Sequence, residues 1–170
     1  MFTRIDHVGV AVPDLDAAIA FYEGTFGFRC VHVETNEGQG VREAMLAVGD
    51  GQTQVQLLAP VSPDSAIARF LDHNGPGVQQ VAYTVDDVEA VCAELRARGL
   101  RVLYDEARPG TLGTRVNFVH PKDAGGVLVE LGVHRNERLE DGLPGRVGDG
   151  AHASHEGREV RRVRVRVALQ

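Results

Sequence analysis

Apolar residues alternate with small or polar ones near the start of the chain, in the stretch "TRIDHVGVAVPD". This period of two predicts a β-strand whose Val8, Val10 and Val12 side chains share one face. His7 then lies on the other face, beside Gly9. A histidine on a half-buried strand is most often a hydrogen-bonded structural residue. A functional role for His7 therefore needs support from the rest of the chain.

The pattern that begins at His7 returns in the second half of the chain. The stretch "HVGVAVPDLDAAIAFYEGTFG" aligns with "QVAYTVDDVEAVCAELRARG", which begins at Gln80. In each stretch a strand leads to an Asp at a helix start, an amphipathic helix and a closing glycine. Three strand-like runs follow each helix: "RCVHVET", "REAMLAVG" and "TQVQLLAP" in the first half, then "RVLYDEA", "TRVNFVH" and "GVLVELGV" in the second. The chain therefore contains two tandem βαβββ modules.

These modules predict an α+β domain over residues 1–133. The modules cover about 1–60 and 77–133, and the segment 61–76 contains a short linker helix between them. After residue 133 the chain becomes polar, rich in glycine and without periodicity, which is typical of a disordered tail over 134–170. Its last stretch, "VRRVRVRVALQ", alternates well enough that a strand at a sheet edge is the other interpretation.

Four polar residues lie on the strand face opposite the helices, on the first and last strand of each module: His7, Gln56, Gln80 and Glu130. His7 and Gln56 are 49 residues apart, and Gln80 and Glu130 are 50 apart. A pseudo-twofold axis between the modules would bring the four together. One imidazole nitrogen, two amide oxygens and a carboxylate suit a divalent metal ion of intermediate hardness. The set contains no cysteine, which argues against a structural zinc site.

Composition limits the partners that the body can have. The chain has 170 residues, of which 43% are hydrophobic and 25% charged, as expected for one globular domain. Residues 1–133 hold 10 Lys and Arg against 18 Asp and Glu, which argues against a nucleic-acid partner. The sequence has no run near the ~20 apolar residues that cross a bilayer and no signal pattern, so we expect a cytoplasmic protein without a membrane partner. Cys30 and Cys92 are expected to be buried free thiols.

The body resembles the vicinal oxygen chelate superfamily and, within it, the methylmalonyl-CoA epimerase family. The resemblance is carried by "IDHVGVAVPDL", "GVREAML", "TQVQLLAP", "LRARGLRVLYDE" and "NFVHPKDAGGVLVEL". It implies a curled mixed sheet around a cleft that binds one divalent ion per chain, which could be Co, Mn, Ni, Zn or Mg. The family's metal ligands fall on His7, Gln56, Gln80 and Glu130, and its catalytic base falls on Glu43. The sequence departs from the family at Gln80, where a second histidine is common.

The resemblance also implies a reaction, the interconversion of (R)- and (S)-methylmalonyl-CoA. The α-proton would be removed and returned through an enolate that the metal stabilises. Glu43 shares its strand face with Val41 and Met45, and apolar surroundings would raise its pKa toward that of a useful base. Glu130 is the second carboxylate that could deliver a proton to the opposite face, and a metal-bound water or a single mobile base are the alternatives. The substrate partner is an acyl-CoA thioester, and the fold leads us to expect a homodimer.

Three further residues are candidates for substrate contacts. The offset of 74 residues between Gln56 and Glu130 maps Glu43 onto Asn117, which we expect to donate a hydrogen bond to the substrate. Arg115 and Lys122 are candidate partners of the CoA phosphates. His120, in the same turn-like segment as Lys122, is expected to be structural.

Three other functions are possible for this class of fold. A glyoxalase-type isomerase would use the same metal on a glutathione hemithioacetal. An extradiol dioxygenase requires two histidines and a carboxylate on Fe(II), whereas two of the four candidate ligands here are glutamines. A metal-free resistance protein that binds small molecules usually has an aromatic cleft, and this chain has 5% aromatic residues and no Trp. The substrate and the presence of bound metal discriminate among them.

Overall fold

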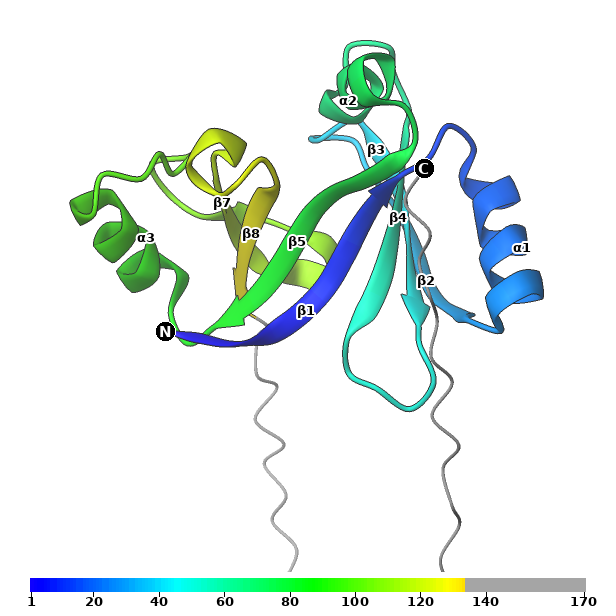
Figure 1. Cartoon of the computed structure of the whole chain (residues 1–170), viewed down its shortest axis with the longest axis horizontal. Helices are drawn as coiled ribbons and strands as arrows, with labels where there is room; N and C mark the ends of the chain where they lie inside the picture. Colours follow the sequence, from blue (N-terminus) through cyan, green and yellow to red (C-terminus); the bar gives the residue numbers. More distant parts are fainter. Residues whose placement is uncertain (134–170) are drawn as a thin grey trace, which may run out of the picture. The chain divides into compact units, whose positions relative to one another are not determined.

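The computed structural model describes residues 1–133, and the predicted tail over 134–170 lies outside the described residues. Within residues 1–133, eight strands form one curled sheet in the order β2-β3-β4-β1-β5-β8-β7-β6 (Figure 1). The elements are β1 (Phe2–Ala11), α1 (Leu15–Phe26), β2 (Arg29–Asn36), β3 (Val41–Ala47), β4 (Gln54–Pro60), α2 (Ala66–Asn74), β5 (Gly77–Val85), α3 (Val88–Ala97), β6 (Arg108–Pro109), the 3-10 turn η1 (Thr111–Gly113), β7 (Arg115–Val119), the 3-10 turn η2 (Pro121–Asp123) and β8 (Leu128–Val133).

The two modules meet at the centre of the sheet, where β1 and β5 pair antiparallel. In the first module β1 pairs in parallel with β4, and in the second β5 pairs in parallel with β8. All other neighbouring strands are antiparallel. Both modules therefore have the same internal order, which confirms the predicted α+β fold with a curled mixed sheet. Helix α2 lies between the modules, within the predicted linker segment.

Helices α1 and α3 begin where the sequence predicts. The Asp14 side chain accepts a hydrogen bond from the backbone N–H of Ala17 at 3.0 Å, and Asp87 caps α3 through Ala90 at 3.0 Å. Gly27 ends α1 with φ 69°, a conformation that costs glycine little. Each helix packs its apolar side against its own module, so each module has its own core on the helix side of the sheet. The other side of the sheet is left for the site.

Helix α2 packs on the opposite, concave side of the sheet, at one end (Figure 1). Ile67 of α2 is buried against Ala11, Val41 and Leu58, which come from three different strands. This third apolar cluster closes the end of the concave face. The polar residues of the concave face lie further along the strands, away from this end.

One predicted strand does not form. Residues 101–107 make only an isolated bridge, between Val102 and Val119, and the edge of the sheet is the two-residue β6. The Asn117 side chain forms hydrogen bonds with the backbone of this segment instead. Its Nδ2 donates to the Tyr104 carbonyl at 2.9 Å, and its Oδ1 accepts from the Tyr104 N–H at 3.2 Å. A side-chain amide thus replaces the ladder that the alternating pattern predicts.

The predictions of no membrane-spanning segment and of free cysteines concern features that the structure describes. No helix within residues 1–133 is long and apolar enough to cross a membrane. Cys30 and Cys92 are both free thiols; Cys92 is buried and Cys30 is half-buried.

Candidate metal and acid–base site

The four residues predicted as metal ligands converge on one point of the concave face. The Nε2 atom of Gln80 lies 2.6 Å from Glu130 Oε2, 3.2 Å from Gln56 Oε1 and 3.5 Å from His7 Nε2. All four residues are buried. Two oxygens and one nitrogen with lone pairs thus surround the Gln80 NH2 group, and half a turn of the Gln80 amide would replace that group by an oxygen, the fourth donor atom.

The glycine beside His7 explains how Gln80 reaches this point. Gly9 lies directly opposite Gln80 in the β1–β5 pair. A Cβ atom at position 9 would lie 2.5 Å from Gln80 Cγ and 3.2 Å from Leu58 Cδ1. A larger residue at position 9 would therefore displace the Gln80 side chain from the cleft. Gly9 therefore leaves the space in which the Gln80 side chain approaches His7.

The chemistry of this donor set fits a divalent cation. Within residues 1–133 no cluster of three or more His, Cys, Asp or Glu side chains could hold a metal. The candidate ligands that can ionise are His7 and Glu130, with 3.7 Å between His7 Nε2 and Glu130 Oε2. The amides of Gln56 and Gln80 complete the set. Burial opposes protonation of His7, but hydrogen bonds to Asp6 and Glu130 outweigh it and raise its pKa to about 9. The point where the side chains meet therefore stabilises positive charge.

A buried carboxylate lies next to this set. The side chain of Glu43 accepts a hydrogen bond from Thr111 Oγ1 at 2.7 Å and one from Gln56 Nε2 at 3.0 Å. Burial raises the pKa of Glu43 to about 7, against the opposing effect of the Thr111 hydrogen bond, and the carboxylate of Glu34 on β2 adds to the rise. Glu43 is thus poised to exchange a proton near neutral pH, one hydrogen bond away from a candidate metal ligand.

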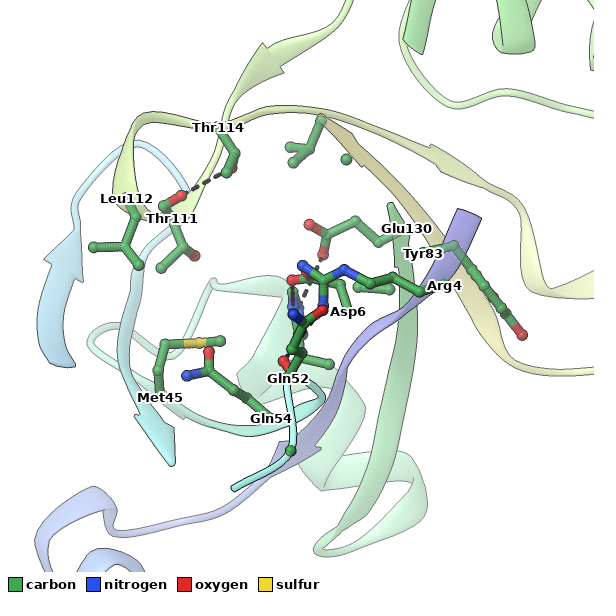
Figure 2. Close-up of a pocket in the computed structure, with 15 residues that line it drawn as sticks. Arg4, Asp6, Met45, Gln52, Gln54, Tyr83, Thr111, Leu112, Thr114 and Glu130 are labelled. Carbon is green, nitrogen blue, oxygen red and sulfur yellow. Dashed lines mark hydrogen bonds and ion pairs between the residues drawn. The ribbon is translucent and has the colours of Figure 1, made fainter. Parts of the chain in front are cut away.

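Two cavities open on the site. The larger one, of about 590 Å³, runs from Glu43 and Gln80 to the start of α2, to Tyr104 and to Arg108 of β6. The smaller one, of about 390 Å³, lies on the other side of Glu130 and is drawn in Figure 2. Thr111, Val116 and Glu130 line both cavities. Both cavities therefore give access to the cluster.

Two of the three residues predicted to contact substrate, Asn117 and Arg115, do not face these cavities. Asn117 is fully buried, and its amide is bonded to the backbone of Tyr104. The Arg115 guanidinium donates to Glu89 of α3 at 2.6 Å. Both side chains lie on the face that α3 covers, so the predictions for Asn117 and Arg115 were wrong.

A difference of one residue in register accounts for this error. Gln56 pairs with Met45 across β3 and β4, whereas Glu130 pairs with Phe118 across β7 and β8, so the second connection is one residue longer. A shift of one residue turns every side chain of a strand to the opposite face. Val116, not Asn117, therefore occupies the position that corresponds to Glu43.

The turn that contains Lys122 is also remote from the site. His120 Nδ1 accepts a hydrogen bond from the Lys122 backbone N–H at 3.1 Å and so caps η2. This geometry agrees with the structural role predicted for His120. Lys122 lines neither cavity.

Two residues of the site were not predicted, Asp6 and Thr111. Strand alternation places Asp6 on the face opposite His7, yet the two side chains are 2.9 Å apart, between Asp6 Oδ2 and His7 Nδ1. Thr111 lies in the loop before β7, where Leu112 has φ 55°, rare for a residue other than glycine. The sequence signals a turn there through its glycines, but not that a hydroxyl reaches Glu43.

Comparison with known proteins agrees with this class of fold and site. The family model described as the Glyoxalase/Bleomycin resistance protein/Dioxygenase superfamily matches residues 6–118. The chain belongs to this superfamily.

Among its relatives, the chain is similar to methylmalonyl-CoA epimerases. It is 42% identical over 129 residues to the mitochondrial methylmalonyl-CoA epimerase of Mus musculus, which covers 75% of this chain and 71% of the relative. The crystal structure of methylmalonyl-CoA epimerase from Mycobacterium tuberculosis is 53% identical, has a TM-score of 0.75 and covers 78% of this chain and 88% of that one. A structure of a methylmalonyl-CoA epimerase in complex with methylmalonyl-CoA and NH4+ is 48% identical, has a TM-score of 0.77 and covers 80% of this chain and 97% of that one.

Proposed function

We propose that this chain epimerises methylmalonyl-CoA at the carbon between the thioester and the carboxylate. One observation carries the proposal: the buried carboxylate of Glu43 lies one hydrogen bond from the point where His7, Gln56, Gln80 and Glu130 converge. The similarity to methylmalonyl-CoA epimerases supports the same activity. A base beside a cation site is what proton removal next to a carbonyl requires.

The residues of the chain divide the work between holding charge and moving a proton. His7, Gln56, Gln80 and Glu130 would hold a divalent cation, which when bound would stabilise the negative charge that develops on the thioester oxygen. Glu43 takes the α-proton while the C–H electron pair moves toward the thioester carbonyl. Thr111 and Gln56 hold the two oxygens of Glu43 in place. Return of a proton to the opposite face of the carbon completes epimerisation, and Glu130, which lines the same cavity as Glu43, is the candidate carboxylate for this step.

We assign the larger cavity to the CoA part of the substrate. It leads from the catalytic groups to Arg108, whose guanidinium lies 3.6 Å above the Tyr104 ring. A cation over an aromatic ring at the mouth suits a ligand that carries phosphates and an adenine base. Arg108 thereby replaces Arg115 and Lys122 as the candidate for contacts with the CoA phosphates.

Replacing Arg108 by Gln is expected to raise KM for methylmalonyl-CoA by about threefold to tenfold and to leave kcat nearly unchanged, because the lost contact is remote from the reacting carbon. Steady-state kinetics measures both constants. Arg115→Gln is the matched control, since Arg115 is an exposed arginine on the other face of the sheet, and its KM should not change. An equal rise of KM in the two variants would contradict the assignment.

The function itself is tested by NMR in D2O, which follows incorporation of deuterium at the α-carbon of methylmalonyl-CoA, with and without a chelator. We expect incorporation by the metal-loaded protein and its loss after chelation. Turnover of a glutathione hemithioacetal without α-proton exchange in methylmalonyl-CoA would point to a glyoxalase-type isomerase instead. Purification without bound metal, together with no exchange when Co²⁺ is added, would favour a metal-free binding protein.

A further inference from the structure

Asp6 contacts the imidazole of His7 and takes no part in the proton transfer proposed above. Its Oδ2 lies 2.9 Å from His7 Nδ1. Its Oδ1 lies 2.8 Å from Arg4 Nη2 and accepts a hydrogen bond from Thr84 Oγ1 at 3.2 Å. The carboxylate is therefore held in place from one side while it faces the imidazole with the other.

A β-bulge brings Asp6 and His7 to the same side of β1. In the pairing with β5, Ile5 lies opposite Tyr83 and His7 lies opposite Ala82, so Asp6 is the extra residue between two consecutive pairs. Figure 2 shows Asp6 and Arg4 in the wall of the smaller cavity, beside Glu130. A bulge next to a site commonly serves to redirect a side chain in this way.

The position of the hydrogen on the His7 ring decides whether His7 can bind a cation. A neutral imidazole carries its hydrogen on one nitrogen and a lone pair on the other. Glu130 Oε2 lies 3.7 Å from Nε2 and would favour a hydrogen there, where it would block the lone pair. Asp6 Oδ2 is closer to the ring, at 2.9 Å from Nδ1, and favours the hydrogen on Nδ1.

We infer that Asp6 is a positioning residue, which holds the hydrogen of neutral His7 on Nδ1 and so directs the Nε2 lone pair toward a divalent cation. The inference rests on the cation site of the proposed function, but not on the identity of the substrate. Arg4 and Thr84 in turn orient Asp6. Outer carboxylates that act through a histidine typically change metal affinity about 10- to 100-fold.

The first test titrates metal-free, full-length protein with Co²⁺ and follows its visible absorption. Asp6→Asn is expected to weaken Co²⁺ binding by about tenfold or more, because the neutral amide holds the Nδ1 hydrogen less strongly. Asp123→Asn is the matched control: it also removes a carboxylate that pairs with an arginine, Arg101, but lies away from the cleft. Its Co²⁺ affinity should equal that of the wild type.

A second variant and a second readout separate this role from a general loss of structure. Thr84→Val removes one anchor of Asp6 at nearly constant volume and should weaken Co²⁺ binding in the same direction, by about threefold. In ¹⁵N-labelled, Zn²⁺-loaded protein, the His7 ring hydrogen should be found on Nδ1 at low field, and its resonance should move upfield in both variants.

The outcomes distinguish the inference from the proposed function. Absence of Co²⁺ binding to the wild type would refute the cation site itself, and the inference with it. Co²⁺ binding by the wild type and by folded Asp6→Asn with equal affinity would overturn the inference alone. If Asp6→Asn does not fold, Thr84→Val decides: an unchanged Co²⁺ affinity and an unchanged ring resonance would overturn it.

Discussion

Replacing Glu43 by Gln is expected to slow exchange of the methylmalonyl-CoA α-proton with solvent deuterium by about 10²- to 10⁴-fold, the usual contribution of a general base. The amide has nearly the same shape as the carboxylate and can still accept the Thr111 hydrogen bond, but it cannot take a proton at neutral pH. The measurement is deuterium incorporation by NMR under saturating substrate. Co²⁺ titration of the same variant should show that metal binding is retained.

The carboxylate opposite Glu43 supplies a control for this prediction. Glu34 lies directly across from Glu43 in the β2–β3 pair and helps to raise the pKa of Glu43. Glu34→Gln should therefore keep α-proton exchange above pH 7 and lower the pKa of Glu43. Because the basic form of Glu43 is then present at lower pH, the acidic limb of the pH–rate profile should shift to lower pH. Retained exchange in Glu43→Gln at all pH values would remove Glu43 from the role of base.

The convergence of four distant residues could be predicted because it follows from strand phase together with the internal repeat. His7, Gln56, Gln80 and Glu130 each occupy the alternate position to the apolar residues of their strand. Once the repeated βαβββ order is recognised, the pairing of β1 with β5 brings these faces together. Periodicity and internal repetition can both be recognised in a single sequence, and here they are sufficient to locate the cleft.

The sequence misleads where one extra residue is inserted in a strand or a connection. Asn117 was assigned to the cleft with the offset that holds between β4 and β8, but the connection before β8 is one residue longer. Asp6 was not predicted as a site residue, because strand alternation places it opposite His7 and a bulge in β1 follows no periodicity. Both features reverse the direction of a side chain without changing the apolar pattern around it, so the sequence alone gives no sign of them.

Thr111 illustrates a different limit. Its hydroxyl donates a hydrogen bond to Glu43 from a turn that lies 68 residues further along the chain. The path of that turn depends on Leu112 with φ 55° and on Asn117, whose side chain holds the preceding segment at Tyr104. Such contacts depend on the packed tertiary structure and have no local signature.

We expect α-proton exchange to be lost when the cation is removed. We expect the same loss when Glu130, the one anionic ligand in the candidate set, is replaced. The candidate set contains a single carboxylate, Glu130, and the other ligands are neutral when bound to a metal. A divalent ion in a buried site therefore depends on Glu130 for charge compensation. Glu130→Gln should weaken Co²⁺ binding by more than about 100-fold, beyond the range typical of an outer residue such as Asp6.

The two treatments differ in whether they can be reversed. Wild-type protein that has lost its metal to a chelator should regain exchange when Co²⁺ is restored in excess, because the ligands are intact. Glu130→Gln should not regain it, since the site then offers one imidazole and amides without a compensating negative charge. His7→Ala serves as the matched variant: it removes one ligand but keeps the carboxylate, so high Co²⁺ concentrations should restore part of the exchange. Full exchange by chelated protein with less than about one-tenth of a metal ion per chain would show that the polar cluster stabilises the enolate without a cation, through the N–H of Gln80 and the ring of His7.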